Sequence, residues 1–191
     1  MNRKLLLTIG IFLLAAASLG ATMTPRLSLE ELVQRSELIV HGRVLRTWSA
    51  WDDAHQFIWT HSEIEITEAL KGAPGSTIVV SEPGGIVDGV GMWIAGMARY
   101  QPGEEMVVFL YKTPIGYWRA RGLGQGKFKV EEGAVNGERL VQPALQGVVL
   151  AQPIGAPPPA GTDLGRLRGM PLQQFKSQVR SLAALPVQGV K

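Results

Sequence analysis

The sequence predicts a mainly β fold: a small five- to six-stranded barrel with a short N-terminal helix and a C-terminal helix. Three observations predict it. Apolar and polar residues alternate over long segments, most clearly between Ile58 and Thr67, as in strands with one buried face. Turn-forming residues are frequent, with 23 glycines and 12 prolines among 191 residues. Helical spacing of apolar residues is confined to two short stretches, near residue 30 and after residue 170.

The centre of the predicted barrel is a pair of long neighbouring strands, at residues 37–48 and 57–70. Gly42 interrupts the first strand, which predicts a bulge or a sharp bend there. In the second strand the alternation predicts one face with Ile58, Thr60, Ser62, Ile64 and Ile66. The opposite face carries Trp59, His61, Glu63, Glu65 and Thr67.

Further strands are predicted at apolar runs bounded by turn residues, namely 77–81, 105–112, 117–120 and 126–131. The run 105–112 is the most hydrophobic, so we expect it to lie centrally. Asn136-Gly137 predicts a two-residue hairpin turn after the last strand of this series. The connection 84–103 is rich in glycine but also carries apolar residues, so we expect part of it to pair as strand or to pack back.

The chain divides into a barrel domain of residues 22–150, a proline- and glycine-rich linker of residues 151–170, and a C-terminal helix of residues 171–185. A short helix opens the domain, because Ser28 and Glu31 form a capping box at its start. In the C-terminal helix four apolar residues recur at helical spacing: Leu172, Phe175, Val179 and Leu182. We expect this stripe to dock on the barrel; binding a partner is the alternative.

Residues 1–21 have the pattern of a signal peptide. Two basic residues precede an apolar run from Leu5 to Leu14, and the small residues Ser18 and Gly20 fit a cleavage site. The run is short for a membrane span, so we expect no stable span after cleavage; an uncleaved anchor is the alternative. The predicted location is therefore outside the cytoplasm, either periplasmic or secreted.

Charge and cysteine content narrow the classes of function. Without residues 1–20 the chain has 17 basic and 16 acidic residues, a balance that gives no basis for nucleic-acid binding. The chain has no cysteine, which excludes a disulfide framework and leaves its stability to the hydrophobic core. The expected partner is a protein or another macromolecule.

No pattern of catalytic residues stands out in the sequence. Asp52-Asp53 and Glu104-Glu105 are adjacent pairs, and adjacent strand residues point to opposite faces instead of converging across a cleft. A nucleophile elbow and a phosphate-binding glycine loop are also missing. The sequence therefore predicts a non-catalytic binding or interaction module that uses no cofactor.

The three histidines, His41, His55 and His61, all lie in or between the first two strands. In one interpretation His41 and His61 face each other across the strand pair, and His55 or a loop aspartate completes a metal shell. The protein would then be a metal-dependent hydrolase. We favour the alternative that they are surface or cross-strand residues, because His61 shares its face with two glutamates.

Aromatic residues supply the candidates for a binding surface, which are Trp48, Trp51, Trp59, Trp93 and Tyr100. The first three bracket the loop between the two long strands, and the other two belong to the glycine-rich connection. Exposed rings at these positions would form a platform for a partner. The alternative is that they close the ends of the barrel.

Three segments of the chain carry a resemblance to a known family. LVQRSELIVHGRV, the strand end EALKG and the later GEEMVVFL resemble the netrin-like domains, and most closely the tissue inhibitors of metalloproteinases. They are also similar to exported bacterial proteins of unassigned role. The resemblance covers residues 28–130 and implies an OB-like barrel.

The inhibitors place a free N-terminal cysteine on the zinc of a protease, and this chain has no cysteine. A mature chain that begins at Ala21 or Thr22 would nevertheless start a similar short distance before Ser36. The resemblance therefore implies an alternative function as an inhibitor or regulator of an extracytoplasmic metalloprotease, acting through its mature N-terminus.

Overall fold

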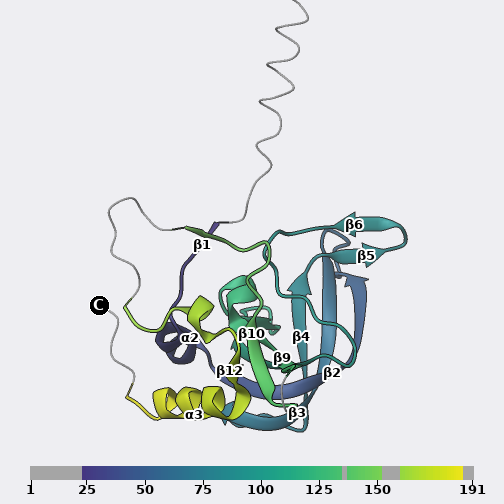
Figure 1. The fold of residues 1–191 in the computed structure, drawn as a ribbon. Coiled ribbons are helices and arrows are strands. Elements are labelled where there is room, and N and C mark those ends of the chain that lie inside the picture. The colour runs from purple at the N-terminus through teal and green to yellow at the C-terminus, as the bar shows by residue number, and fades with distance from the viewer. Residues whose placement is uncertain (1–22, 135–136, 152–159, 187–191) are drawn as a thin grey trace, which may run out of the picture.

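The computed structural model describes residues 23–134, 137–151 and 160–186. They form a mainly β fold with one mixed eight-stranded sheet, two small two-stranded sheets and two α-helices (Figure 1). The predicted signal peptide and the predicted mature N-terminus, at Ala21 or Thr22, lie outside the described residues. Among the residues that are described, no helix is long and apolar enough to cross a membrane.

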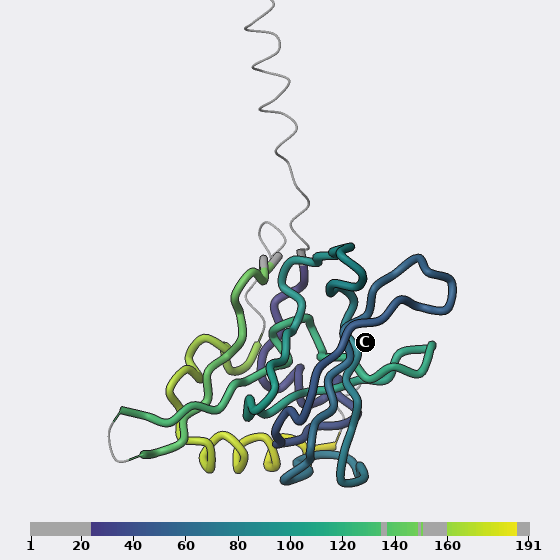
Figure 2. The backbone as a smooth tube through the Cα atoms, turned by 90° about the vertical axis from the view of Figure 1, so that its right-hand side faces the viewer, coloured from purple at the N-terminus to yellow at the C-terminus, as the bar shows by residue number. Residues whose placement is uncertain are grey.

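The two long strands form an antiparallel hairpin, as predicted. They are β2 (Leu38–Trp51) and β3 (Ile58–Lys71), and the tip of the hairpin stands away from the rest of the molecule in Figure 2. The predicted alternation in β3 is confirmed, since Ile58, Ser62 and Ile64 are buried while the side chains between them are half-buried or exposed. This alternation turns one side of the hairpin toward the core.

Gly42 lies at the predicted irregularity in β2. The register of β2 with β3 shifts between His41 and Gly42, which is the signature of a bulge. A Cβ atom at this position would lie 2.9 Å from Cγ2 of Ile64 and would collide with the carbonyl oxygen of Glu65. Only glycine allows the two strands to approach this closely.

Three more strands connect this hairpin into a closed series of pairings. β4 (Thr77–Pro83) pairs antiparallel with β3, and β7 (Glu105–Lys112) pairs antiparallel with β2. β8 (Trp118–Ala120) pairs antiparallel with β7 and in parallel with β4. The pairings therefore return to their starting point through β2, β3, β4, β8 and β7. All five strands contribute to one buried apolar cluster, whose members include Val40, Ile64, Val80, Val108 and Ala120.

The rest of the large sheet continues from β7. β9 (Lys127–Glu132) pairs with β7, β10 (Arg139–Pro143) pairs with β9, and β12 (Met170–Pro171) pairs with β10, all antiparallel. The β9–β10 pairing confirms a hairpin at this place, but its register sets Arg139 against Glu132, whereas a two-residue turn at Asn136-Gly137 would set Arg139 against Ala134. Asn136 itself lies outside the described residues. The small sheets pair β1 (Met23–Pro25) with β11 (Val149–Ala151), and β5 (Gly85–Val87) with β6 (Val90–Met92).

Both helices pack on one side of the molecule, away from the β5–β6 hairpin (Figure 1). α2 (Leu29–Arg35) begins with the predicted capping box between Ser28 and Glu31. α3 (Leu172–Ala183) buries Phe175 against the rings of Phe109 and Phe128, at 6.3 and 4.7 Å between ring centres. The predicted docking of the last helix is therefore confirmed.

Part of the predicted linker 151–170 belongs to the fold. Residues 152–159 lie outside the described residues, but the following turn, η2 (Leu164–Leu167), buries both of its leucines in the core beneath α2 and α3. Asp163 caps this turn and β12 follows it. The sequence predicts only a linker here because the stretch is rich in proline and glycine. Its two leucines are too widely spaced to form an apolar run, so they gave no sign of a buried turn.

A short turn of 3₁₀-helix, η1 (Leu123–Gly126), precedes β9. The buried Gln125 side chain ties this turn to the N-terminal segment: its Oε1 accepts from the N–H of Leu27 (2.9 Å), and its Nε2 donates to the carbonyl of Pro25 (3.0 Å). These bonds fix the path of the chain into α2.

Candidate functional site

Four aromatic side chains form a continuous row on the outer face of the sheet, and we call this row the aromatic face. Its members are Trp48 from β2, Trp59 and His61 from β3, and Tyr117 from the turn before β8. His61 stacks on Trp48 with ring centres 5.4 Å apart and meets the edge of Tyr117 at 5.8 Å. Trp59 also packs against Tyr117 in an edge-on arrangement, with ring centres 4.9 Å apart.

The backbone explains why these rings meet. Alternation along β3 puts Trp59 and His61 on the same side, opposite the buried Ile58 and Ile64, and the β2–β3 register sets Trp48 directly against His61. Tyr117 is held by a closed turn, because its N–H donates to Oγ1 of Thr113 at 2.9 Å. The predicted sharing of one face by Trp59 and His61 is thus confirmed, whereas Tyr117 comes from a segment too distant for sequence periodicity to connect.

The aromatic face is partly open to solvent, and an arginine packs on one of its rings. Trp48 is 38 % exposed, and the guanidinium of Arg46 lies 4.9 Å from its ring centre. A groove beside the row is lined by His61, Val79, Ser81 and Tyr117, among others. Nδ1 of His61 lies 2.8 Å from Oγ of Ser81, and burial lowers the pKa of His61, so this ring is neutral at pH 7.

The three histidines occupy three separate environments. The strand register sets His41 against Glu68 and His61 against Trp48, so the metal-site interpretation in which His41 and His61 face each other is wrong. In an antiparallel hairpin, paired residues lie about equally far from the turn. His41 lies much farther from the β2–β3 turn than His61 does, so the two cannot be paired. His55 lies at the hairpin tip, where it stacks on Trp51 at 6.1 Å. Within the described part of the chain, no group of three or more potential ligands is placed to hold a metal ion.

His41 is a buried member of an ionic cluster between β2, β7 and β10. Its Nε2 lies 2.5 Å from Oε1 of Glu105, which also pairs with Arg43 and Arg139. Burial, followed by the positive charges of Lys176, Arg139 and Arg43, lowers the pKa of His41 to about 4. Glu105 acts in the opposite direction, but its charge is already shared by two arginines. We therefore assign His41 a neutral, structural role.

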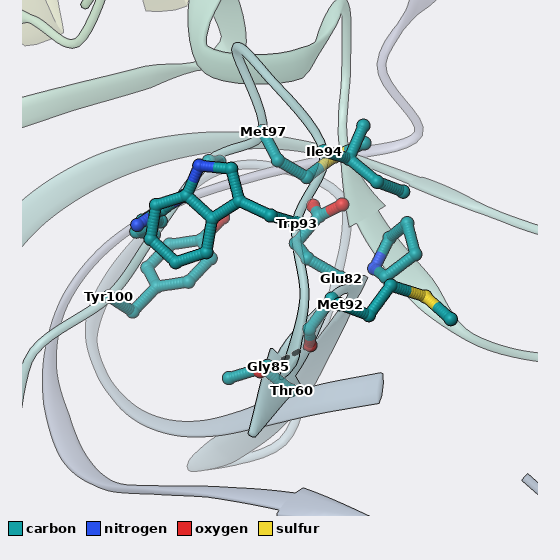
Figure 3. A pocket seen from close by; sticks show the side chains of 12 residues that line it. Thr60, Glu82, Gly85, Met92, Trp93, Ile94, Met97 and Tyr100 are labelled. Atoms are coloured by element: carbon teal, nitrogen blue, oxygen red, sulfur yellow. Dashed lines mark hydrogen bonds between the residues drawn. The ribbon is translucent and has the colours of Figure 1, made fainter. Parts of the chain in front are cut away.

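A second candidate site is a pocket of about 160 Å³ at the end of the core, which we call the Tyr100 pocket (Figure 3). It lies between the ends of β3 and β4 and the segment 92–100. Its lining is mostly apolar and comprises Thr60, Glu82, Pro83, Gly84, Gly85, Met92, Trp93, Ile94, Met97, Ala98, Arg99 and Tyr100. Thr60 and Glu82 are paired residues of β3 and β4 and point to the core side of the sheet.

Glu82 brings a buried carboxylate to the Tyr100 pocket. One oxygen accepts from the N–H of Ala120 at 2.6 Å, and the other accepts from Nε of Arg119 at 3.1 Å. Burial raises the pKa of Glu82 to about 7, although Arg119 and the bond from Ala120 oppose the rise. Sequence reasoning ended this strand at Ser81 and missed Glu82. Its position two residues after the inward-facing Val80 was the signal that marked it as an inward side chain.

Tyr100 was predicted to lie on the surface, and this is wrong: it is only 6 % exposed and packs in the core of the five-strand cycle. Its hydroxyl is buried and has no hydrogen-bond partner among the described residues. Burial raises the pKa of this hydroxyl well above its usual value, so the hydroxyl stays protonated and can donate. Nζ of Lys127 lies 4.9 Å from the ring centre.

The other predicted surface aromatics differ in exposure. Trp93 is 70 % exposed at the mouth of the Tyr100 pocket, and the guanidinium of Arg99 stacks 3.0 Å from the centre of its ring. Trp51 and Trp59 are half-buried. Trp48, Trp59 and Trp93 therefore contribute to candidate sites, while Trp51 mainly contacts its own hairpin.

Comparison with known proteins gave no relative. No protein-family model matches the sequence, and no curated protein or solved structure matches it at a significant level. The function must therefore be inferred from the chemistry of the sites themselves.

Proposed function

We propose that this chain is an exported, non-catalytic binding module that holds a protein or another macromolecule on its aromatic face. The observation that carries the proposal is the unbroken row from Trp48 through His61 and Tyr117 to Trp59, which is drawn from three chain segments. Large, partly exposed rings give contact area at low cost in side-chain entropy, and tryptophan, tyrosine and arginine dominate binding hot spots. Cross-strand packing alone does not require Trp48 to stay open to solvent.

We also propose that the five-strand cycle is a small OB-type barrel of the netrin-like kind that the sequence resembles. What supports this is the pairing pattern: an antiparallel series β2–β3–β4, a β2–β7 pair, and a parallel β4–β8 contact that closes the cycle. OB barrels bind ligands on the face of their second and third strands and on the loop between the fourth and fifth. In the proposed barrel β3 would be the second strand, and the turn before β8 would be the loop between the fourth and fifth strands. The aromatic face takes Trp59 from the former and Tyr117 from the latter.

The experiment uses the protein from residue 22 onward as bait for extracytoplasmic proteins of its own source. Trp48→Ala and Tyr117→Ala should each weaken capture of a partner at least tenfold, because each removes a ring worth about 1.4 kcal/mol or more. Leu185→Ala is the matched control, since Leu185 is 58 % exposed but lies just beyond α3. A photo-cross-linking residue at position 48, and not at 185, should become attached to the partner.

Thermal melting decides whether a loss of capture is specific. Trp48→Ala and Tyr117→Ala should melt within a few degrees of the wild type. Capture that survives both changes would contradict the proposal, and so would variants that lose binding only because they unfold.

A further inference from the structure

The aromatic face borders on two grooves that join into one. The first groove, of about 450 Å³, is lined by His61 and Tyr117, among others. The second, of about 210 Å³, lies between the turn before β4 and the start of β2, where Pro74 and Leu38 line it. Three residues line both grooves: Thr77, Ile78 and Trp118. The two therefore form one longer groove, which we call the Trp118 groove.

The lining of the Trp118 groove carries almost no charge. Among the described residues that line it, the one charged side chain is Glu37, at the end away from the aromatic face. An oxygen of Glu37 already accepts from the N–H of Lys112 at 3.0 Å. Beside the row of rings, Arg46 is paired with Glu63 at 2.6 Å. A nucleic acid would find no unpaired cation for its phosphates along this lining, so the groove favours an uncharged ligand.

The rings beside the groove offer hydrogen-bond donors to a ligand. The hydrogen bonds of Tyr117 to other described residues all use its backbone, which leaves its hydroxyl free. Neither this hydroxyl nor Nε1 of Trp59 is a buried atom without a partner, so both reach solvent. Trp48, whose ring is 38 % exposed, carries a further indole N–H, a group that can only donate. A ligand that matches these groups presents carbonyl oxygens and few donors of its own.

The planes of the rings also meet at steep angles. Tyr117 stands at 63° to Trp59 and at 78° to His61, so the row has corners where the rings meet edge-on. Nucleobases stack flat on the face of an aromatic ring, and this arrangement suits them poorly. A small, rigid ring fits a corner better. Proline supplies such a ring, and its fixed φ holds the chain extended before binding.

We propose that the aromatic face and the Trp118 groove bind a proline-rich segment of another protein in the polyproline II conformation. This inference rests on the proposed function and names its partner. A polyproline II segment has no internal hydrogen bonds, so its carbonyl oxygens are free to accept from Trp48, Trp59 and Tyr117. Its prolines have no N–H and bring no donor that the face would leave unpaired. Proline-rich segments dock in grooves lined by aromatic residues and lose little entropy, because they are already extended.

The test measures binding of three uncharged probes to the protein from residue 22 onward by calorimetry. The probes are a capped oligoproline, a capped glycine–serine peptide of the same length and a cello-oligosaccharide. Wild-type protein should bind oligoproline at least tenfold more tightly than the glycine–serine peptide. In NMR spectra the indole N–H signals of Trp48, Trp59 and Trp118 should shift with oligoproline, whereas that of Trp93, at the mouth of the Tyr100 pocket, should not.

Two pairs of variants locate the binding energy. Trp48→Ala should weaken oligoproline binding at least tenfold, and Trp51→Ala is the matched control, since Trp51 stacks on His55 of its own hairpin. Tyr117→Phe keeps the ring and removes the donor, so it should weaken binding about fivefold. Its matched control is Tyr111→Phe, because the guanidinium of Arg121 lies 4.0 Å from the centre of the Tyr111 ring. Tyr117→Phe also keeps the test decisive if an alanine variant unfolds.

Several outcomes would overturn the proposal. They are equal affinities for the two peptides, tighter binding of the cello-oligosaccharide than of oligoproline, and an unchanged affinity in both Trp48→Ala and Tyr117→Phe. The chain itself carries three consecutive prolines at 157–159. Self-association that Trp48→Ala abolishes would place a second copy on the face and overturn the assignment to another protein. Capture of a partner through Trp48 without any binding of oligoproline would overturn this inference alone and leave the proposed function standing.

Discussion

Glu82 on β4 and Arg119 on β8 form an ion pair of 3.1 Å in which the glutamate side chain is almost completely buried. The two strands pair in parallel at a single position, Val80 with Trp118. The ion pair and the bond from Ala120 to Glu82 therefore reinforce the contact that completes the five-strand cycle.

Replacing Arg119 tests this reinforcement. Arg119→Met leaves the buried carboxylate without its charged partner, so the free energy of unfolding should fall by about 3 kcal/mol at pH 8, measured by urea unfolding. The matched control is Arg46→Met, which breaks the exposed pair with Glu63 and should cost less than about 1 kcal/mol. Similar losses in the two variants would show that Glu82 is not held by Arg119.

Glu82 should make the fold less stable as the pH rises. An unfolded glutamate loses its proton near its ordinary pKa of 4.5, whereas folded Glu82 keeps the proton until about pH 7. Between these values the folded state binds more protons, so its stability falls with rising pH, by about 3 kcal/mol over the window. His41 acts in the opposite direction over part of this range, so the test is the difference between two variants: the free energy of unfolding of Glu82→Gln should rise by about 3 kcal/mol relative to that of Glu65→Gln, on the exposed side of β3, between pH 4.5 and pH 8. Urea unfolding at pH 4.5, 6 and 8 measures it.

His41 should act in the opposite direction. Its folded pKa of about 4 lies below the ordinary value of 6.5, so the unfolded state binds more protons between these values. Stability should therefore rise from pH 4 to pH 6.5 and be lost as the pH falls through that range. In an NMR titration the ring of His41 should remain neutral down to pH 5. The control variant His55→Asn, at the exposed tip of the hairpin, should give the same titration curve for His41. A midpoint near 6.5 for His41 would contradict the assignment.

Tyr100→Phe should stabilise the protein by about 1 kcal/mol, because it removes a buried hydroxyl that has no partner among the described residues. Tyr117→Phe, at a half-buried ring of the aromatic face, should have little effect. Differential scanning calorimetry measures both melting temperatures. A destabilised Tyr100→Phe variant would mean that the hydroxyl already has a partner in the folded protein.

The turn after the predicted linker should prove essential to the core. Leu167→Ala removes a fully buried side chain, so we expect a loss of about 3 kcal/mol in the free energy of unfolding. Leu185→Ala, at an exposed leucine just beyond α3, should change it by less than about 0.5 kcal/mol. Equal and small effects would restore the view that residues 160–170 only connect the sheet to α3.

Local patterns in the sequence predicted the elements well. The capping box of Ser28 and Glu31, the strand Glu105–Lys112 and the alternation in β3 all stand in the structure as expected. Each depends on side chains only a few residues apart, which the chain itself brings together. The β2–β3 register, which separates His41 from His61, was also accessible by counting outward from the hairpin turn.

The sequence by itself determined which segments become strands and helices, and which of their faces are apolar, because these properties follow from the spacing of neighbouring residues. Only the tertiary structure decided that Tyr117 meets His61, that Glu82 meets Arg119, and that the buried hydroxyl of Tyr100 has no partner among the described residues. The first two contacts join residues 56 and 37 positions apart, and the burial of Tyr100 depends on how the glycine-rich connection packs. Strand pairing and core packing establish them, and no local period in the sequence encodes either one.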